Sequence, residues 1–235
     1  MNILLIGYGK MGHAIEEIAK ERGHTITGAL NSEEERNAWK GEADVAIEFS
    51  QPDAAFDNIH FAIERGIPVV SGTTGWLERQ HDVATLCEKH NGAFFYASNY
   101  SIGVNIFFRV NRYLADIMGQ QEGYDVEMEE VHHTEKKDAP SGTAITLAED
   151  IIERVKQKSR WVNETTEEKD ALGISSLRID KTPGTHTVTY SSDIDSIEIK
   201  HTAHSRKGFA LGAVVAAEWL SGRQGVFGMD DMLPF

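Results

Sequence analysis

The segment EEVHHTEKKDAPSGTA, which runs from Glu129 to Ala144, gathers several groups that can transfer a proton or bind an anion. Histidine titrates near neutral pH, so His132 and His133 are candidate proton carriers. Ser141 is placed to cap the helix that follows, and the Gly142–Thr143 amides would then lie at a helix N-terminus, where anions bind. The segment therefore predicts a carboxylate-binding turn beside a general acid.

Lysines and an arginine could supply the positive charge that a bound carboxylate needs. Lys136 and Lys137 lie a few residues before the turn, where one ammonium could fold over the carboxylate, and we interpret Lys137 as an ordinary surface lysine. Near the C-terminus, Arg206 stands just ahead of the last predicted helix, and arginine is suited to a bidentate grip on a second carboxylate. A capped helix with a surface lysine and a histidine bonded to the backbone is the purely structural alternative.

The same residues do not predict a metal site. If YDVEMEEVH is a strand, His132 and His133 point to opposite faces and cannot easily share one ion. A metal would need further ligands from Glu135, His201 or His204, and none of the spacings matches a recognised ligand motif. His201 and His204 could also line the anion site, although histidines near a strand end are more often structural.

A second group of residues lies at the N-terminus, where GYGKMG places Gly7, Gly9 and Gly12 in the G-x-G-x-x-G spacing. The motif follows an apolar strand and opens a predicted helix, as in dinucleotide-binding folds. A tight turn without function is the alternative, but the strand–helix units that follow favour binding of NADH or NADPH. The residues at the end of the second strand, Asn31 and Ser32, leave the choice between these cofactors open, because neither repels a 2′-phosphate nor pairs with it strongly.

Two further loops fall at the ends of predicted parallel strands, where open α/β sheets bind their ligands. SGTTGW starts at Ser71 and ASNYSIGVN starts at Ala97. Their small and polar residues could approach a ribose or a nicotinamide amide closely. Ordinary turn chemistry is the alternative for either loop alone.

The elements that must position these groups follow two patterns. Up to residue 98, strand-like runs (NILLIG, TITGAL, DVAIEFS, IPVVSG, GAFFYAS) alternate with helix-like segments, which is typical of a parallel sheet with helices on both faces. Beyond it we predict a helix over Gly103–Met118, the strand YDVEMEEVH and a helix over Thr143–Val155. The polar segment Lys156–Gly173 is predicted as a mobile loop. SLRID, THTVTYSS and SIEIKHTAH are then strands without intervening helices.

We therefore predict an α/β protein in which a Rossmann-type doubly wound parallel sheet is joined to a second α+β domain built on an open mixed sheet. The first domain covers residues 1–101, and residues 206–235 return to it. The second domain covers residues 102–205.

Composition argues against several functions. The chain of 235 residues has a net charge of -14, which disfavours nucleic acid or an anionic membrane as a partner. The apolar run at the N-terminus, Asn2–Ile6, is too short for a membrane span and lacks the basic flank of a secretion signal. The single cysteine, Cys87, excludes an internal disulfide and suits the reducing cytoplasm, where we expect the protein.

In chain order, GYGKMG, SGTTGW, ASNYSIGVN, EEVHHTEKKDAPSGTA and HTAHSRKGFALGAV resemble the motifs of the 4-hydroxy-tetrahydrodipicolinate (formerly dihydrodipicolinate) reductases of lysine and diaminopimelate biosynthesis. The run H-H-x-x-K-x-D-A-P-S-G-T-A is highly specific to that family. The resemblance implies reduction of a cyclic dicarboxylate by NADH or NADPH with loss of water. It also implies a substrate-binding second domain that assembles homotetramers.

The resemblance further implies roles for matching residues. His132 would donate the proton and Lys136 would be its catalytic partner, while His133, Gly142 and Thr143 would bind a substrate carboxylate. The implied cofactor-binding residues, with Asn31 added for its place at the ribose, are Gly7, Tyr8, Gly9, Lys10, Met11, Gly12, Asn31, Gly72, Thr73, Thr74, Ala97, Ser98, Asn99 and Tyr100. Many family members have an acid and an arginine where this chain has Asn31 and Ser32, so a cofactor preference is not carried over.

Other functions remain open at this point. Another Rossmann amino-acid or imine dehydrogenase would act on a linear amino or keto acid, and it leaves HHTEKKDAPSGTA unexplained. A nicotinamide-sensing binding protein would keep the glycine loop without chemistry, and the grouping of histidine, lysine and anion site speaks against it. A metal hydrolase is the least favoured.

Overall fold

The computed structural model of the chain describes residues 1–205 and 207–233, which form two compact units. The first comprises Met1–Ile102 and the C-terminal segment that starts at Lys207, and the second starts at Gly103. Within the described ranges, no helix is both long enough and apolar enough to cross a lipid bilayer.

The first unit is built on a six-stranded parallel sheet. Its strands are β1 (Asn2–Ile6), β2 (Thr25–Leu30), β3 (Val45–Glu48), β4 (Val69–Ser71), β5 (Ala93–Tyr96) and β11 (Gly225–Phe227). Their order is β11-β5-β4-β3-β1-β2, and every neighbouring pair is parallel. The chain therefore changes its direction of growth between β1 and β3, and open α/β sheets bind ligands beyond the carboxyl ends of the strands at such a point.

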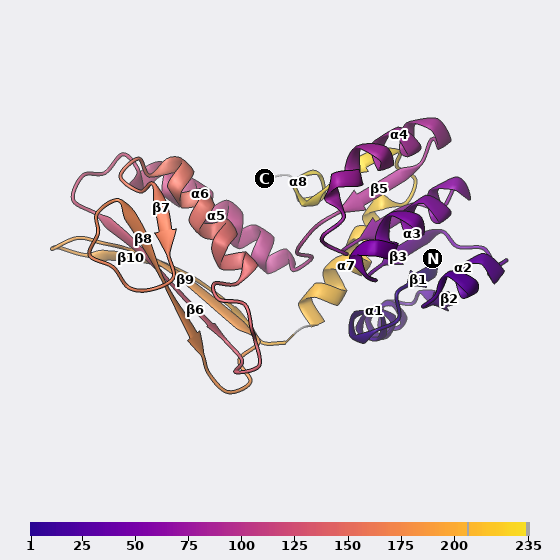
Figure 1. Cartoon of the computed structure of the whole chain (residues 1–235), viewed down its shortest axis with the longest axis horizontal. Coiled ribbons are helices and arrows are strands. Elements are labelled where there is room, and N and C mark those ends of the chain that lie inside the picture. Colours follow the sequence, from indigo (N-terminus) through magenta and orange to yellow (C-terminus); the bar gives the residue numbers. More distant parts are fainter. Residues whose placement is uncertain (206, 234–235) are drawn as a thin grey trace. The chain divides into compact units, whose positions relative to one another are not determined.

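Helices cover both faces of this sheet, as Figure 1 shows. They are α1 (Lys10–Glu21), α2 (Glu33–Ala38), α3 (Pro52–Glu64), the 3₁₀ turn η1 (Leu77–Arg79), α4 (Gln80–His90), α7 (Lys207–Leu220) and α8 (Met229–Met232). Ile3 and Leu5 of β1 pack into one core with α1 and α7, whereas Leu4 and Ile6 pack into another with α3 and α4. A strand buried on both faces needs the continuous apolar run that NILLI provides.

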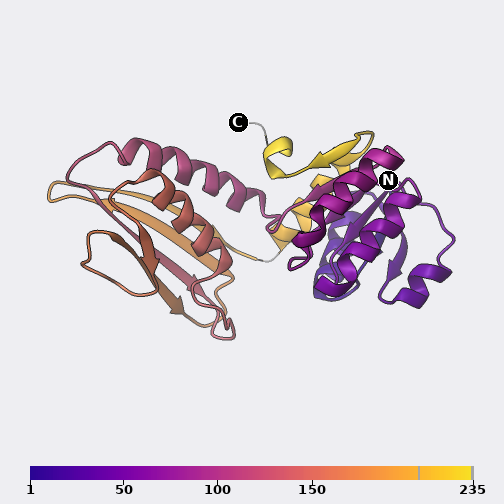
Figure 2. The ribbon, with the colours of Figure 1, turned by 45° about the horizontal axis from the view of Figure 1, so that its top comes forward.

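The second unit is a mixed sheet with two helices on one face. Its elements are α5 (Ile102–Met118), β6 (Asp125–His132), α6 (Gly142–Arg154), β7 (Arg160–Val162), β8 (Ala171–Arg178), β9 (Gly184–Ser191) and β10 (Ser196–Ala203). The order is β10-β9-β6-β8-β7, with β6 parallel to β8 and antiparallel to β9. Helices α5 and α6 lie side by side over the same face in both ribbon views (Figure 1 and Figure 2), and Phe107, Leu147 and Ile151 belong to the core beneath them.

The predicted fold class is confirmed, with one local error. The prediction of a loop over Lys156–Gly173 is wrong, because this segment contains β7 and the first residues of β8. Strand β7 has three residues between polar neighbours, so no alternation develops in the sequence. Its position is set by parallel pairing with β8, in which Trp161 lies opposite Leu172.

Candidate active site

The glycine loop between β1 and α1 has the geometry that a dinucleotide requires. Gly7 has a φ of +92°, and a Cβ on it would lie 2.0 Å from the Phe49 carbonyl oxygen. A Cβ on Gly12 would lie 2.5 Å from the Gly7 carbonyl oxygen. Gly9, by contrast, is the N-cap of α1, and a Cβ on it would meet nothing within 4 Å. The three positions thus fit a tight turn, close helix–strand packing and an open approach for a pyrophosphate.

The end of β2 contacts this loop and brings an acid to it. Tyr8 N donates to Asn31 Oδ1 at 2.6 Å, and Asn31 N donates to Glu35 Oε2 at 2.6 Å. Arg36, the next residue, donates to Asn58 Oδ1 at 2.8 Å. A carboxylate and a guanidinium therefore both flank the end of β2, where an adenine ribose binds in this type of fold.

A buried glutamate that the sequence analysis missed organises the loops after β3 and β4. Glu48 ends β3, is fully buried, and accepts hydrogen bonds from the hydroxyls of Ser50, Ser71 and Thr73. Burial raises the pKa of this carboxyl, and the hydroxyl bonds offset part of that rise. The side chain of Thr73, a predicted cofactor residue, is thereby committed to holding its own loop.

The predicted cofactor residues differ in exposure. Thr73, Ala97 and Tyr100 are buried, and the Tyr100 hydroxyl donates to the Ser71 carbonyl at 2.7 Å. Residues with exposed side chains are Lys10, Asn31, Thr74 and Ser98. All of these residues follow the carboxyl ends of β1, β2, β4 or β5, which lie at one edge of the parallel sheet.

The candidate acid of the second unit lies where the helix-covered face of β6 becomes polar. Val126 and Met128 pack beneath the helices, and Glu130 and His132 continue the same face. Glu130 is fully buried, and the His132 side chain is 10% exposed. His132 Nδ1 lies 3.1 Å from Glu130 Oε2. The predicted proton donor therefore faces a carboxylate that the sequence analysis did not assign.

Both oxygens of Glu130 are engaged. Oε1 accepts from Ser141 N at 3.1 Å and from Arg178 Nη2 at 3.2 Å, and Oε2 lies 3.7 Å from His186 Nε2 in addition to its contact with His132. Burial alone would raise the pKa of this carboxyl, but bonds from His132 and Ser141 hold that pKa well below its usual range. Glu130 is therefore an anion at neutral pH.

His186, on β9, is the uncharged member of the group. It lies opposite Glu130 in the strand register, with Nε2 3.2 Å from Ser141 Oγ. Ser141 Oγ also accepts from Ala144 N as the N-cap of α6. Burial first, and then the nearby His132, lower the pKa of His186 from 6.5 to about 4. A neutral imidazole thus holds the cap of α6.

The cluster also has the composition of a metal site. Glu130, His132 and His186 offer ligand atoms within 4.8 Å of one another. However, Ser141 N and the Arg178 guanidinium already bind Glu130 Oε1, and the Ser141 hydroxyl binds His186. A guanidinium at the same carboxylate disfavours a second cation there. We therefore interpret the cluster as a hydrogen-bond network.

Lys136 lies in the loop beside this network and has a carboxylate partner. Its Nζ donates to the two Asp138 oxygens at 2.8 and 2.7 Å. Arg178 ties the loop to the sheet by donating to the Lys136 carbonyl at 3.4 Å and the Asp138 carbonyl at 2.6 Å. Arg178 ends β8, about 40 residues along the chain, so no local motif in the sequence could reveal this role.

The remaining predicted substrate residues are placed differently from one another. Gly142 and Thr143 open α6 behind the Ser141 cap, as predicted, and Gly142 is exposed. His133 lines a cavity formed with the loop between β8 and β9. Arg206, the predicted ligand of a second carboxylate, lies outside the described residues.

His201, whose role the sequence left open, has a structural environment. Its ring lies 5.9 Å from that of Phe107 on α5, and His201 pairs with His186 in the register of β10 and β9. Burial lowers its pKa. A packed, neutral ring of this kind stabilises the helix-covered face of the sheet by packing, and it is not suited to binding an anion.

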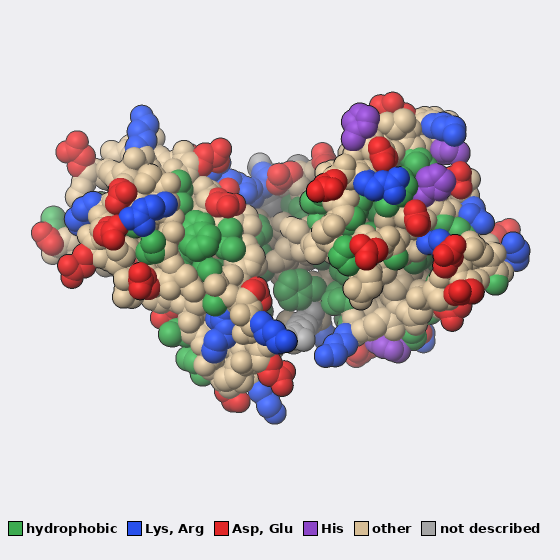
Figure 3. Space-filling view, viewed as in Figure 1, with side chains coloured by type: hydrophobic (Ala, Val, Ile, Leu, Met, Phe, Trp, Pro, Cys, Tyr) green, Lys and Arg blue, Asp and Glu red, His purple; other side chains and the backbone are tan. Residues whose placement is uncertain are grey.

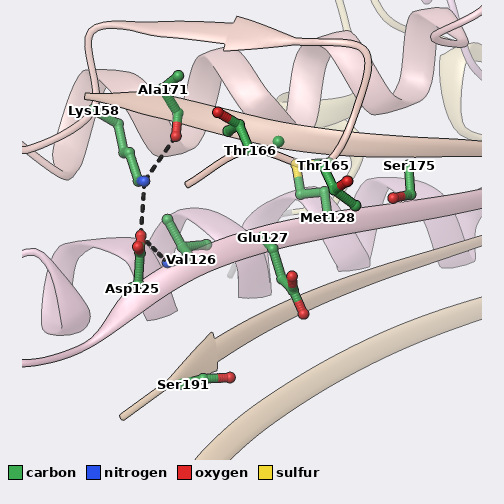
Figure 4. A pocket seen from close by; sticks show the side chains of 11 residues that line it. Asp125, Val126, Glu127, Met128, Lys158, Thr165, Thr166, Ala171, Ser175 and Ser191 are labelled. Atoms are coloured by element: carbon green, nitrogen blue, oxygen red, sulfur yellow. Dashed lines mark hydrogen bonds and ion pairs between the residues drawn. The ribbon is translucent and has the colours of Figure 1, made fainter. Parts of the chain in front are cut away.

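A separate cavity lies at the other end of β6 (Figure 4). There Lys158, with a side chain 4% exposed, bridges Asp125 Oδ1 at 2.7 Å and the Ala171 carbonyl at 2.8 Å. Asp125 and His132 are the first and last residues of β6, about 23 Å apart along the strand, and the cavity is lined by the Asp125–Met128 half of it. It is not part of the candidate active site.

Comparisons with known proteins agree along the whole chain. The family profile "Dihydrodipicolinate reductase, N-terminus" matches residues 1–100, and "Dihydrodipicolinate reductase, C-terminus" matches residues 103–233. The 4-hydroxy-tetrahydrodipicolinate reductase of Christiangramia forsetii is 52% identical, covering 99% of this chain and 98% of that protein. The enzyme of the same name from Archaeoglobus fulgidus is 36% identical, covering 93% of this chain and 87% of its own length.

A solved structure shows the same fold. Dipicolinate-bound dihydrodipicolinate reductase from Paenisporosarcina sp. TG-14 superposes with a TM-score of 0.80 at 20% identity, covering 99% of both chains. The match extends over both units. The chain therefore belongs to the dihydrodipicolinate reductase family.

Proposed function

We propose that this chain reduces 4-hydroxy-tetrahydrodipicolinate to tetrahydrodipicolinate, with loss of water, in lysine and diaminopimelate biosynthesis. The observation that carries the proposal is the 52% identity to the Christiangramia forsetii reductase over nearly the full length of both proteins. In this proposal the first unit is the dinucleotide-binding domain, and the second is the substrate-binding and oligomerisation domain.

The reductant in this proposal is NADH or NADPH. Either would supply the hydride that reduces C4 of the conjugated cyclic imine formed when the substrate loses water. The Gly9 backbone and the N-terminus of α1 would face the pyrophosphate, and the loops after β4 and β5 would face the ribose and nicotinamide. Glu35 favours a free ribose hydroxyl and Arg36 favours a 2′-phosphate, so both cofactors belong in the test.

His132 is the proposed proton donor. It quenches the negative charge that develops on the substrate as C4 is reduced, and its location beside the Glu130 carboxylate supports that role. Lys136 would bind one substrate carboxylate, which would take the place that Asp138 now holds at the ammonium. Holding the reactants in this way can lower a barrier by roughly 7–11 kcal/mol.

The other substrate contacts follow from the same proposal. The Gly142–Thr143 amides at the start of α6, together with His133, would bind the carboxylate that Lys136 holds. Arg206 would bind the second carboxylate. A cyclic dicarboxylate held at both carboxylates is thus what distinguishes this substrate from the linear amino or keto acids of other dehydrogenases.

The direct test follows NADH and NADPH oxidation by the wild-type chain, side by side, with substrate freshly prepared by the synthase that makes it. We expect turnover with at least one cofactor and none when the substrate is replaced by a linear amino or keto acid. Turnover of the linear acid alone would favour another dehydrogenase. Cofactor binding without any turnover would favour a nicotinamide-sensing protein.

A homotetrameric state and a cytoplasmic location complete the proposal. Exposed apolar residues follow one stripe of α5, and Figure 3 shows hydrophobic side chains gathered on that part of the second unit. The stripe consists of Ile106, Val110, Tyr113 and Ile117. Contiguous exposed apolar surface of this kind supports association between chains. The one cysteine, Cys87, is a buried free thiol, which suits a reducing compartment.

A further inference from the structure

We infer that Glu130 is a positioning residue that fixes the orientation and tautomer of His132, so that the proton leaves the imidazole from Nε2. The inference rests on the proposed function and adds a residue to which the sequence analysis assigned no role. It comes from the contacts of a single buried carboxylate.

The contact with Glu130 restricts the orientation of the His132 imidazole. Nδ1 of His132 and Oε2 of Glu130 are 3.1 Å apart. Both atoms are shielded from solvent, and neither makes a hydrogen bond of regular geometry among the described residues, so the contact between them is the one that can satisfy both. A buried carboxylate needs a hydrogen at that distance, so Nδ1 carries one. The other ring nitrogen, Nε2, is then the atom whose proton can be lost.

The space around Nε2 supports this assignment. The start of β9 lies beside this nitrogen, and Gly184 there has no side chain. A Cβ built on Gly184 would lie 3.1 Å from Nε2 and 3.4 Å from Cδ2. A side chain at this position would therefore crowd the Nε2 edge of the ring, which glycine leaves clear.

The same carboxylate also holds the start of α6. Glu130 Oε1 accepts from Ser141 N at 3.1 Å, and Ser141 immediately precedes the amides of Gly142 and Thr143. One side chain thus fixes the proposed proton donor and the proposed carboxylate-binding turn relative to each other. Sub-ångström placement of this kind matters because small misplacements of a catalytic group can cost large factors in rate.

Other polar groups face His132 or Glu130 from the neighbouring elements. The Arg178 guanidinium reaches Glu130 from β8, and His186 faces the imidazole edge-on from β9 with ring centroids 5.1 Å apart. Lys136 and Asp138 lie in the following loop, paired with each other. Glu130 is the anion in direct contact with the imidazole, so its removal affects the imidazolium most.

The test compares Glu130→Gln with Glu129→Gln, whose side chain is exposed on the opposite face of β6. For Glu130→Gln we expect kcat to fall about 100-fold, by analogy with the loss of a group that orients a catalytic histidine. The basic limb of the kcat–pH profile should move to lower pH, because the imidazolium loses its anionic neighbour. The Kd of NADH should not change. Glu129→Gln should match the wild type in all three measurements.

A substitution that merely weakened folding would lower kcat without moving the pH profile. An unshifted profile in a folded Glu130→Gln protein, checked by circular dichroism, would overturn the inference.

A second measurement on the wild-type chain does not depend on how the variant folds. Nitrogen-15 NMR of the histidine rings, with His132→Gln used to assign the signals, should show Nδ1 of His132 protonated across the titration and Nε2 as the site that loses its proton. A ring with its proton on Nε2 would overturn the inference even if the enzyme is active. Absence of turnover by the wild type, in contrast, would remove the proposed function and leave the tautomer measurement valid.

Discussion

At the scale of single residues, the glycines of the β1–α1 loop differ in what a side chain would meet, and this makes a clean prediction for cofactor binding. Gly9→Ala should leave stability nearly unchanged, because its Cβ would meet no protein atom within 4 Å. The same Cβ would enter the space through which a pyrophosphate approaches, so we expect the Kd of the reduced dinucleotide to rise about tenfold or more.

Isothermal titration with NADH and NADPH, together with thermal unfolding, measures both effects for Gly9→Ala. The matched control is Gly12→Ala, which should unfold at lower temperature because its Cβ would lie 2.5 Å from the Gly7 carbonyl oxygen. An unchanged Kd in Gly9→Ala would remove this loop from the cofactor site.

Residue types in the sequence were enough to nominate His132 and the Gly142–Thr143 turn, because their chemistry is local and closely spaced. The alternation of the predicted strand YDVEMEEVH places Glu130 on the same face as Val126 and Met128, but a glutamate there gives no sign of its partners. Arg178 and His186 come from other strands, and only the strand register brings them to Glu130. A site assembled by sheet pairing cannot be completed from one segment alone.

At the scale of elements, the pairing of β6 with β9 buries the imidazole of His186, and this burial makes folding stability depend on pH. His186 has a pKa of about 4 in the folded chain and 6.5 in the unfolded one, so the unfolded chain binds more protons between these values. Stability is therefore retained above about pH 6.5 and decreases as pH falls toward 4. For this group alone we expect a loss of about 2 kcal/mol in the free energy of unfolding between pH 7 and pH 5.

Urea unfolding of the wild type and of His186→Gln at these two pH values measures that contribution. The wild type should lose more stability than the variant on acidification, by about the amount stated above. Equal losses in the two proteins would mean that His186 is charged, or exposed, in the folded state.

Element boundaries were predictable where the local sequence shows an apolar run or a regular alternation of apolar and polar residues. The apolar run of β1 and the alternation of β6 are such cases, and both strands lie where the sequence predicts them. Strands β7 and β11 have three residues each, and they exist because a neighbouring strand edge accepts them. So short a segment shows no pattern of its own, because the strand is stabilised by pairing with residues elsewhere in the chain. The loop prediction over Lys156–Gly173 failed for this reason.

At the scale of the whole molecule, the chain distributes its chemistry over two units. The first carries the glycine loop, and the second carries the proposed acid and the proposed carboxylate-binding turn. The family match extends over both units, so both belong to the architecture of the family.

Assembly is tested at this scale by light scattering coupled to size exclusion. We expect the mass of four chains. Tyr113→Glu, on the exposed stripe of α5, should shift the population toward smaller species if that stripe takes part in association, because a charge would be buried there. A single-chain mass for the wild type would contradict the tetramer.

The most direct measurement compares wild type with His132→Gln in the reductase assay, using the synthase product and the preferred cofactor. We predict that kcat falls by about 100- to 10,000-fold, which is the usual contribution of a general acid, while the Kd of the cofactor is unchanged. A His132→Gln protein that turns over the substrate at the wild-type rate would contradict the assignment of the proton donor, and with it the account of the second unit as the acid half of the enzyme.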